Sequence, residues 1–569
     1  MAMASINVNK KSVKDFLREG KQHPFLIPEY QRPYAWTDEQ VITLFEDLLE
    51  FTETSVDNND EMSSYFLGSI VSYENEMREQ EIIDGQQRIT SLFLLLRAIY
   101  TKLDSMPSKP QEAKHFLSEI KPIIWKQNNL TGEIDFTKIL LTSKVMNNTG
   151  NEILRKILEK GIVDKNAKDN YSKNYLLFQE LFDKLSLEKP MIIYQFILHL
   201  LEKTILLPIQ ADNQDIALNI FSTLNDRGLP LSDADIFKAK IYNKLSDDKK
   251  QDFINRWQEL DERAQSLNES IQQLFYYYMF YLRAVEKDSK TTTPGLRKYY
   301  AQNKFERLDV PELLNQFDMI LNLWEVIVNK NYVENESWSA NKDIVNILDV
   351  LSSYTNEFWK YPVIIYYLTY CESDNFEHNF LIYLRKLAVE LCTKYVVTST
   401  VNAVKADIIK LNISIIESSH PNFSFKSISK ESLKRGLQIP HRNIVRMLLK
   451  LIAYQKQSNP LPKKWEIEHI LPKNYQRTYF TSINDSTIKK LIEHIGNKVP
   501  FEKKLNIKAS DNYFAKKKKD YQKSSINMTK ELALIPTSNW KLDEIYTRDA
   551  ELISMLLNLF DEWNEAYIQ

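Results

Sequence analysis

Apolar positions in the first 245 residues alternate between short continuous runs and longer stretches with helical spacing. The runs at 65–73, 81–83 and 204–210 are short and rich in β-branched or aromatic residues, which is typical of strands. Directly after the second run, residues 89–103 are strongly apolar over a length that predicts a helix. This alternation predicts a mixed α/β domain over residues 1–245.

Helical spacing dominates the middle of the chain. Residues 246–450 repeat apolar positions about every 3.6 residues and contain aromatic clusters such as 275–278, so we expect a helical bundle with these rings mostly in its core. A further helix is expected near the N-terminus, after a cap at Thr37 or Asp38. Its apolar face consists of Val41, Leu44, Phe45, Leu48 and Leu49.

The last 119 residues, 451–569, begin with short apolar runs and not with long stretches of helical spacing. One run covers 467–471, a second surrounds Asn497, and the segment that begins at Asn506 can form a helix. The predicted order is therefore strand, strand, helix. Together the three regions predict an α+β protein that is predominantly helical.

Composition narrows the class of protein without naming a partner. At 569 residues the chain is too long for one core, and only 10 glycines favour helices over tight hairpins. The 74 basic and 76 acidic residues nearly cancel, so a polyanion site must be a local patch. Two cysteines, Cys371 and Cys392, cannot form a disulfide framework, and no apolar run reaches the ~18 residues of a membrane span. We expect a cytoplasmic protein that does not contact a membrane.

A carboxylate, an imidazole and two side-chain amides lie within about 40 residues of one another near the C-terminus. Glu468 and His469 are adjacent, Asn497 lies in the next short run, and Asn506 follows nine residues later. Such groups, brought together, can hold a divalent cation and activate a water molecule. Adjacent strand residues point to opposite faces, so a shared site requires a local bend. Without that bend, a surface Glu–His pair is the more frequent explanation.

Lysines follow this candidate site closely. Residues 497–530 contain ten lysines against three acidic residues, a local excess that suits a phosphate backbone. The run Lys516, Lys517, Lys518 and Lys519 is the densest part. A lysine run is also typical of an ordinary solvated helix face.

A second candidate site follows the predicted strand 81–83. Asp84-Gly85-Gln86-Gln87-Arg88 precedes the apolar helix, a geometry that presents backbone N–H groups to an anion. Asp84 could bind a metal ion or hydroxyl and Arg88 a phosphate, but a helix cap and a surface ion pair explain the same residues. Downstream, Asn225, Arg227 and Lys238 could reach a phosphate or simply form a turn.

The C-terminal segments WEIEHILPKN, IGNKVPFEKKLN and NYFAKKKKDYQKS, with a tail from Trp540 to Arg548, resemble a known family. They are similar to the HNH-type nuclease domain (a ββα-metal fold) of the GmrSD modification-dependent, type IV, restriction enzymes. At 498–500 the sequence differs from the usual pattern of that family, and these residues belong to a predicted strand. The resemblance implies that His469 is the general base, that Asn497 orients its loop, and that Glu468 and Asn506 bind Mg²⁺ or Mn²⁺. It also implies that Lys516–Lys519 contact the DNA backbone.

The N-terminal half resembles the ParB/sulfiredoxin-like NTPase domain of the same enzymes. Three motifs carry this likeness, in order: 27–36 (IPEYQRPYAW), 84–92 (DGQQRITSL) and 221–231 (FSTLNDRGLPL). The resemblance implies a nucleoside triphosphate site in which Asp84 and Arg88 are catalytic. The implied nucleotide-binding residues are Gln31, Arg32, Asp84, Gly85, Gln86, Gln87, Arg88 and Asn225. An aromatic wall of Tyr30, Tyr34 and Trp36 would help sense modified DNA.

The function implied by both resemblances is that of a modification-dependent endonuclease in anti-phage defence. NTP hydrolysis in residues 1–245 would be coupled to metal-dependent cleavage of modified double-stranded DNA by residues 451–569. Alternatives are a phosphorothioate-sensing DNA nickase of the same architecture and a nucleotide-switched DNA-binding regulator with an inactive nuclease domain. A helical scaffold with incidental motifs is a further alternative, and a homo-oligomer is compatible with the sequence.

Overall fold

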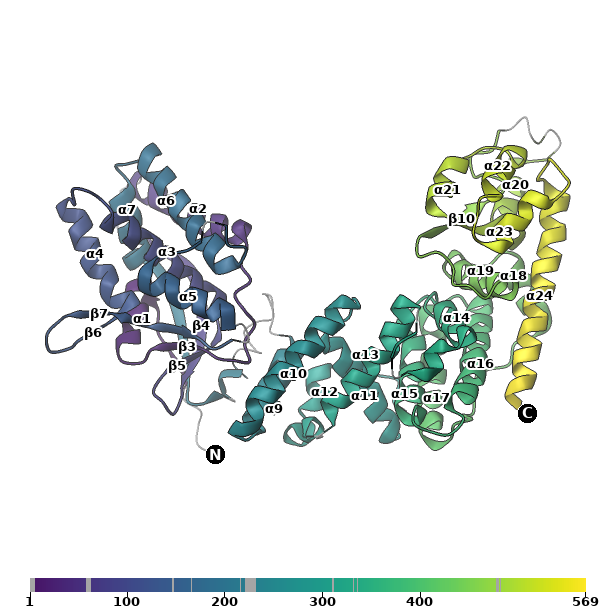
Figure 1. Ribbon diagram of the computed structural model, residues 1–569, viewed down its shortest axis with the longest axis horizontal. Coiled ribbons are helices and arrows are strands. Elements are labelled where there is room, and N and C mark those ends of the chain that lie inside the picture. The colour runs from purple at the N-terminus through teal and green to yellow at the C-terminus, as the bar shows by residue number, and fades with distance from the viewer. Residues whose placement is uncertain are drawn as a thin grey trace. The chain divides into compact units, whose positions relative to one another are not determined.

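The structure, a computed structural model, divides into two compact units, Met1–Gln258 and Glu259–Gln569. It describes residues 6–57, 63–145, 148–164, 166–214, 216–218, 220, 232–309, 312–330, 332–334, 336–476, 480 and 483–568. Helices predominate in both units, and most strands belong to the first (Figure 1). The predicted α+β, mainly helical class is confirmed. Asn225, Arg227 and the motif 221–231 lie outside the described residues.

Within the described residues of the N-terminal unit, seven strands form one mixed sheet in the order β1-β9-β4-β5-β3-β8, with β2 also paired to β9. The strands are β1 Ile6–Val8, β2 Lys11–Ser12, β3 Phe25–Ile27, β4 Tyr65–Glu74, β5 Gln80–Asp84, β8 Leu141–Ser143 and β9 Thr204–Ala211. The predicted runs 65–73, 81–83 and 204–210 are thus confirmed as β4, β5 and β9. β4 is antiparallel to β5 and parallel to β9.

Helices cover the sheet, and alternation along the strands decides what each face buries. Ile70 and Ile82 join the large core that the helices complete, whereas their neighbours Val71 and Ile83 join a smaller core with Ala239. The helices are α1 Val13–Arg18, α2 Asp38–Asp57, α3 Gln86–Asp104, α4 Gln111–Ile124, α5 Asn148–Lys160, α6 Asn170–Glu188, α7 Ile193–Leu198 and α9 Asp233–Lys244. A hairpin of β6 Trp125–Gln127 and β7 Ile134–Ile139 projects from this unit (Figure 1).

Parallel pairing of β3 with β5 brings two sequence motifs to one edge of the sheet. The chain leaves β3 after Ile27 and leaves β5 after Asp84, and parallel strands end at the same edge. Gly85, at φ 86°, makes the turn into α3, and a Cβ there would lie 2.3 Å from Cδ1 of Ile70. The left-handed backbone angle favours glycine at this turn, and a side chain there would also displace Ile70.

The C-terminal unit begins with a layer of helices that the aromatic clusters hold together. Tyr277, Tyr278, Tyr366 and Tyr367 are all buried, which confirms their predicted place in the core. The helices are α10 Asp247–Ser266, which crosses into this unit, α11 Ile271–Val285, α12 Leu296–Tyr300, α13 Leu313–Asn329, α14 Lys342–Leu351, α15 Lys360–Tyr370, α16 Phe376–Val397, α17 Lys405–Glu417, α18 Lys430–Gln438 and α19 Arg442–Lys456.

The rest of this unit combines a two-strand ladder with shorter helices. β10 Trp465–His469 pairs antiparallel with β11 Lys498–Glu502, and His469 faces Lys498 across the ladder. The helices are α20 Asp485–Ile492, α21 Lys503–Ala509, α22 Phe514–Tyr521, α23 Asn527–Glu531 and α24 Leu542–Ile568. The helix predicted from Asn506 is therefore two helices, α21 and α22, separated by residues 510–513. The proposed domain boundary at residue 451 stays a prediction.

A buried ionic network joins two helices of the C-terminal unit. Nζ of Lys450, on α19, donates to Oδ1 of Asp349 on α14 at 2.8 Å, and the hydroxyl of Tyr454 donates to Oδ2 at 2.6 Å. Nζ of Lys330 lies 2.7 Å from the same carboxylate. Burial would raise the pKa of Asp349, but the two ammonium groups outweigh burial and lower it. The carboxylate of Asp349 is therefore charged, and both of its oxygens are bonded within the protein.

We expect Asp349→Asn to lower the free energy of unfolding of the C-terminal unit by about 3–5 kcal/mol, because it leaves buried ammonium groups uncompensated. Since the folded-state pKa of Asp349 is lowered, this stabilisation is present above the unfolded-state pKa and is lost as pH falls through the folded-state value. Urea unfolding followed by circular dichroism measures the effect. Asp343 lies on the same helix as Asp349, and Asp343→Asn is the control; it removes an exposed pair with Arg385 of α16 and should cost at most about 1 kcal/mol.

Candidate functional site

His469, the last residue of β10, lies half-buried beside several charged groups. Among the described residues, its buried Nε2 has no hydrogen-bond partner. Burial lowers the pKa of His469 to about 4, helped by Lys473 and Lys498 and opposed by Glu493. The imidazole is therefore neutral at neutral pH, with a nitrogen able to accept a proton.

Glu468 points to the other face of the ladder, away from this position. The register of β10 with β11 is regular through Glu468 and His469, so the bend required for a shared site is absent there. Glu468 is 6% exposed, and its Oε1 accepts hydrogen bonds from Nζ of Lys517 at 2.6 Å and from the hydroxyl of Tyr521 at 2.9 Å. Burial raises the pKa of Glu468, against the opposing charge of Lys517. Glu468 thus serves as an internal ion-pair partner in this structure.

Lys517 fixes the end of β10 as well as neutralising Glu468. Its Nζ also donates to the backbone oxygen of His469 at 2.8 Å and of Ile470 at 3.4 Å. Sequence reasoning missed this role of Lys517 and Tyr521. Their spacing of four residues on α22 places both on one helix face, and that was the available signal.

The four predicted DNA-contacting lysines do not share one environment. Lys516 and Lys519 are exposed on α22. Lys517 is buried against Glu468, and Nζ of Lys518 donates to the backbone oxygens of Ile535 and Thr537. The predicted contact of Lys517 with DNA is contradicted by this burial. Alternate faces of one helix explain the difference, because the run is longer than the solvent-facing stripe.

Asn497, fully buried, holds the chain that follows His469. Its Oδ1 accepts from the N–H of Leu471 at 2.7 Å, and its Nδ2 donates to the backbone oxygen of the same residue at 3.0 Å. Its own backbone oxygen accepts from the N–H of Ile470 at 2.9 Å. This geometry fits the predicted orienting role. Asn506 lies half-buried on α21, which contacts both strands.

In the N-terminal unit, Asp84 and Arg88 flank the turn into α3. Burial raises the pKa of Asp84, opposed by the N–H of Gly85 and by the charges of Arg88 and Arg32. Nη1 of Arg88 donates to the backbone oxygen of Ser69 at 2.6 Å. Gly68, at φ 132°, makes room for that guanidinium, since a Cβ there would lie 2.8 Å from Cζ of Arg88. Arg32 is exposed at the same edge.

The predicted glutamines make bonds within the protein. Nε2 of Gln31 donates to the backbone oxygen of Ile83 at 2.9 Å, and Nε2 of Gln87 donates to that of Pro33 at 3.1 Å. Oε1 of Gln87 accepts from the N–H of Ala35 at 2.7 Å. Nε2 of Gln86 reaches the backbone oxygen of Arg32 at 3.4 Å. These bonds attach the loop after β3 to the turn after β5, which favours a shaping role over nucleotide contact.

The predicted aromatic wall is mostly internal. Tyr30 is buried and donates to Glu81 at 2.5 Å, while Tyr34 is buried, stacks on Tyr171 and bonds Ser91 at 2.7 Å. Trp36 packs partly buried against the large core. In this structure the rings of Tyr30 and Tyr34 cannot contact a base, because the core already covers them.

An additional carboxylate lies near Arg32 and was not identified from the sequence. Asp235 completes the capping box at the start of α9, with its N–H donating to Oγ of Ser232 at 3.2 Å. Ser232 is therefore the N-cap residue of α9. Burial raises the pKa of Asp235, opposed by its bonds to Ser232 and by the charges of Lys238 and Arg32. Asp84 and Asp235 therefore both interact with the exposed guanidinium of Arg32.

Two properties concern the described part of the chain as a whole. No three His, Cys, Asp or Glu side chains converge there as a metal-binding group. None of the helices that the structure describes is long and apolar enough to cross a bilayer.

Comparison with known proteins identifies both ends of the chain. Residues 13–242 match the GmrSD restriction endonuclease N-terminal domain, and residues 424–555 match the GmrSD restriction endonuclease C-terminal domain. Over 249 residues the chain is also 23% identical to an uncharacterized protein of Methanocaldococcus jannaschii. That match covers 41% of this chain and 41% of the relative, so the chain spans about two fifths of the length of the curated relative that it matches. Since the two domain matches together cover more than half of the 569 residues, the chain belongs to the GmrSD restriction endonuclease family.

Proposed function

We propose that this protein is a modification-dependent DNA endonuclease of an anti-phage defence system. Its HNH-type domain cleaves modified double-stranded DNA, and NTP hydrolysis by its ParB-like N-terminal unit controls that cleavage. The observation that carries the proposal is the position of His469. It lies neutral and half-buried at the end of a strand, within a strand–strand–helix element of the segment that matches the GmrSD C-terminal domain.

In the proposed reaction His469 acts as the general base. Its imidazole accepts a proton from water, and the hydroxide attacks the phosphorus of a phosphodiester. A phosphorus–oxygen bond forms, the bond to the 3′-oxygen breaks, and the leaving oxygen takes a proton from solvent. Lys473, exposed next to His469, is the cation that we assign to the phosphate. A bound phosphate stabilises the imidazolium, so DNA binding raises the pKa of His469 from about 4 towards a more effective base.

A divalent cation, Mg²⁺ or Mn²⁺, belongs to the proposal through the family resemblance. Glu468 does not fit as its ligand, because the ammonium group of Lys517 lies 2.6 Å from Oε1 and would repel a second cation. Asn506, half-buried on α21, keeps its proposed role as a ligand. The proton transfer described above therefore depends only on residues of the chain.

The nucleotide site is proposed at the edge where β3 and β5 end. The N–H groups at the start of the 19-residue helix α3 can bind phosphate, and exposed Arg32 adds a positive charge. Asp84 and Arg88 are the proposed catalytic groups, whereas the three glutamines shape the loop. We assign the sensing of modified DNA to this unit, but Tyr30 and Tyr34 take no part in it because their rings are buried.

Cleavage of a DNA panel tests the proposal directly. Unmodified, methylated, hydroxymethylated, glucosylated and phosphorothioated plasmids are incubated with Mg²⁺ or Mn²⁺, with and without NTP. We expect cleavage of a modified plasmid by the wild type and a loss of at least about 100-fold in His469→Ala, since the general base is removed. His378→Ala, an exposed histidine on α16, is the matched control and should cut normally. Equal cleavage by the His469 variant would exclude the assigned base.

The lowered pKa of His469 predicts that kcat/KM stays nearly constant as the pH falls below neutral. For free enzyme with a histidine pKa of about 4, kcat/KM should change less than about twofold between pH 7.5 and 5.5. A histidine at about 6.5 would instead lose about tenfold over the same range, because it becomes protonated. The decline of kcat with falling pH should begin at a higher pH than the decline of kcat/KM, because bound phosphate favours the imidazolium. Steady-state nicking of a fluorescent duplex measures both profiles.

For the N-terminal unit we expect Asp84→Asn and Arg88→Ala to abolish NTP hydrolysis, because they remove the proposed catalytic carboxylate and phosphate-binding fork. Phosphate release measures turnover. Asp183→Asn, which removes an exposed carboxylate paired with Lys102, is the charge-matched control and should hydrolyse NTP normally. His469→Ala should also keep full NTP turnover. Unchanged turnover in both site variants would contradict this assignment.

A further inference from the structure

Arg548, on α24, bonds the backbone on both sides of Asn497. Its Nη1 donates to the backbone oxygen of Gly496 at 2.6 Å and to that of Lys498 at 2.9 Å. The side chain is buried, and burial lowers the pKa of Arg548 to about 10. A buried guanidinium bonded to two carbonyl groups is costly to displace, so it fixes this backbone segment.

Asp549, the next residue of α24, bonds Gly496 and His494 of the same segment. Oδ1 accepts from the N–H of Gly496 at 2.7 Å, and Oδ2 lies 2.5 Å from Nδ1 of His494. Gly496 must be glycine, because a Cβ there would lie 2.4 Å from the backbone oxygen of Ile545 and 2.7 Å from Oδ1 of Asp549. Sequence reasoning did not identify either Asp549 or His494.

These contacts continue from α24 to His469 without a gap. Arg548 and Asp549 fix the backbone around Asn497, and Asn497 in turn bonds Ile470 and Leu471 at 2.7–3.0 Å. His469 immediately precedes those two residues. The hydrogen bonds in this series join buried or half-buried groups, where each bond is stronger than it would be in water, and peptide bonds supply the remaining steps.

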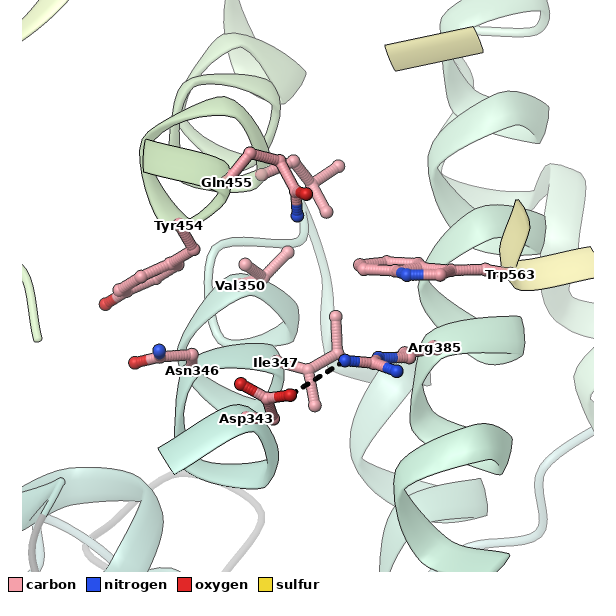
Figure 2. A pocket seen from close by; sticks show the side chains of 9 residues that line it. Asp343, Asn346, Ile347, Val350, Arg385, Tyr454, Gln455 and Trp563 are labelled. Atoms are coloured by element: carbon pink, nitrogen blue, oxygen red, sulfur yellow. Dashed lines mark hydrogen bonds and ion pairs between the residues drawn. The ribbon is translucent and has the colours of Figure 1, made fainter. Parts of the chain in front are cut away.

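The other end of α24 is held by the helical layer. Trp563 lies among α14, α16 and α19, at a cavity of about 50 Å³ (Figure 2). The guanidinium of Arg385 lies 5.5 Å from the Trp563 ring centroid and is bonded to Asp343 at 2.9 Å. Figure 1 shows α24 as one long helix that extends from the level of β10 to the level of α16. The segment around Asn497 is therefore tied to the helical layer through one rigid element.

We propose that Arg548 and Asp549 are positioning residues that hold His469 in register for proton transfer, through Gly496, Asn497 and the Ile470–Leu471 backbone. This proposal rests on the proposed nuclease function for its kinetic consequence, but the mechanical link is independent of activity. It predicts that breaking the contact frees the loop after β10 and slows the chemical step, while DNA affinity is kept.

Four substitutions in the full-length chain test the proposal. Asp549→Leu and Arg548→Gln remove the contacts, Asp549→Asn keeps an acceptor for Gly496, and Asp561→Asn changes an exposed aspartate on the same helix as a control. We expect kcat for DNA nicking to fall by about 10- to 100-fold in the first two, with KM changed less than about twofold, since a small displacement of a catalytic group has an effect of this size. Asp549→Asn and Asp561→Asn should stay within about threefold of the wild type.

Hydrogen–deuterium exchange gives a readout that needs no catalysis. The amides of Ile470 and Leu471 should exchange at least about tenfold faster in Asp549→Leu and Arg548→Gln, whereas peptides of α16 keep wild-type protection. Unchanged exchange at 470–471 in both folded variants would overturn the proposal, as would an equal loss of protection across α16. If the wild type does not cut DNA, the proposed function fails, and exchange at 470–471 still decides whether α24 holds the loop.

Discussion

The hydrogen bonds of buried Asn497 are the constraint on which the candidate nuclease centre depends. They close the backbone after His469 onto the start of β11, at distances of 2.7–3.0 Å, and leave no freedom for the strand end to move alone. Each bond satisfies a backbone group that would otherwise be buried without a partner, which makes its loss expensive. The backbone at and after His469 is thus held by Lys517 and by Asn497.

Strand alternation then separates two residues that are adjacent in sequence. On a regular ladder Glu468 and His469 must face opposite sides, and the protein uses the two sides differently. The inner side pairs Glu468 with Lys517 and Tyr521, and so stabilises α22 against β10. The outer side keeps His469 neutral beside cationic groups. Because the ion pair of Glu468 lies on the other side of the ladder, the half-buried imidazole of His469 stays neutral at neutral pH.

A different constraint organises the N-terminal unit. Because β3 and β5 run in parallel, the motifs after them meet at one edge, and glutamine side chains attach one loop to the other. Glycines at 68 and 85 admit the guanidinium of Arg88 and the turn into α3, where a side chain would collide. Among the residues that the structure describes, the groups at this edge that could contact a ligand are exposed Arg32, half-buried Asp84 and the start of α3.

Periodicity and motif order determined much of this protein by themselves. The strands β4, β5 and β9 and the aromatic core follow from local residue pattern, since apolar spacing is read within a few residues. The resemblance to the family follows from the order of the motifs along the chain. Tertiary structure alone decided what the polar residues of the motifs do. Glu468 became an ion-pair partner, Lys517 was buried, Tyr30 and Tyr34 entered the core, and Arg548 and Asp549 came to flank Asn497 from about 50 residues away. Those outcomes depend on which face of each element is covered, and burial by distant segments is not encoded in local spacing.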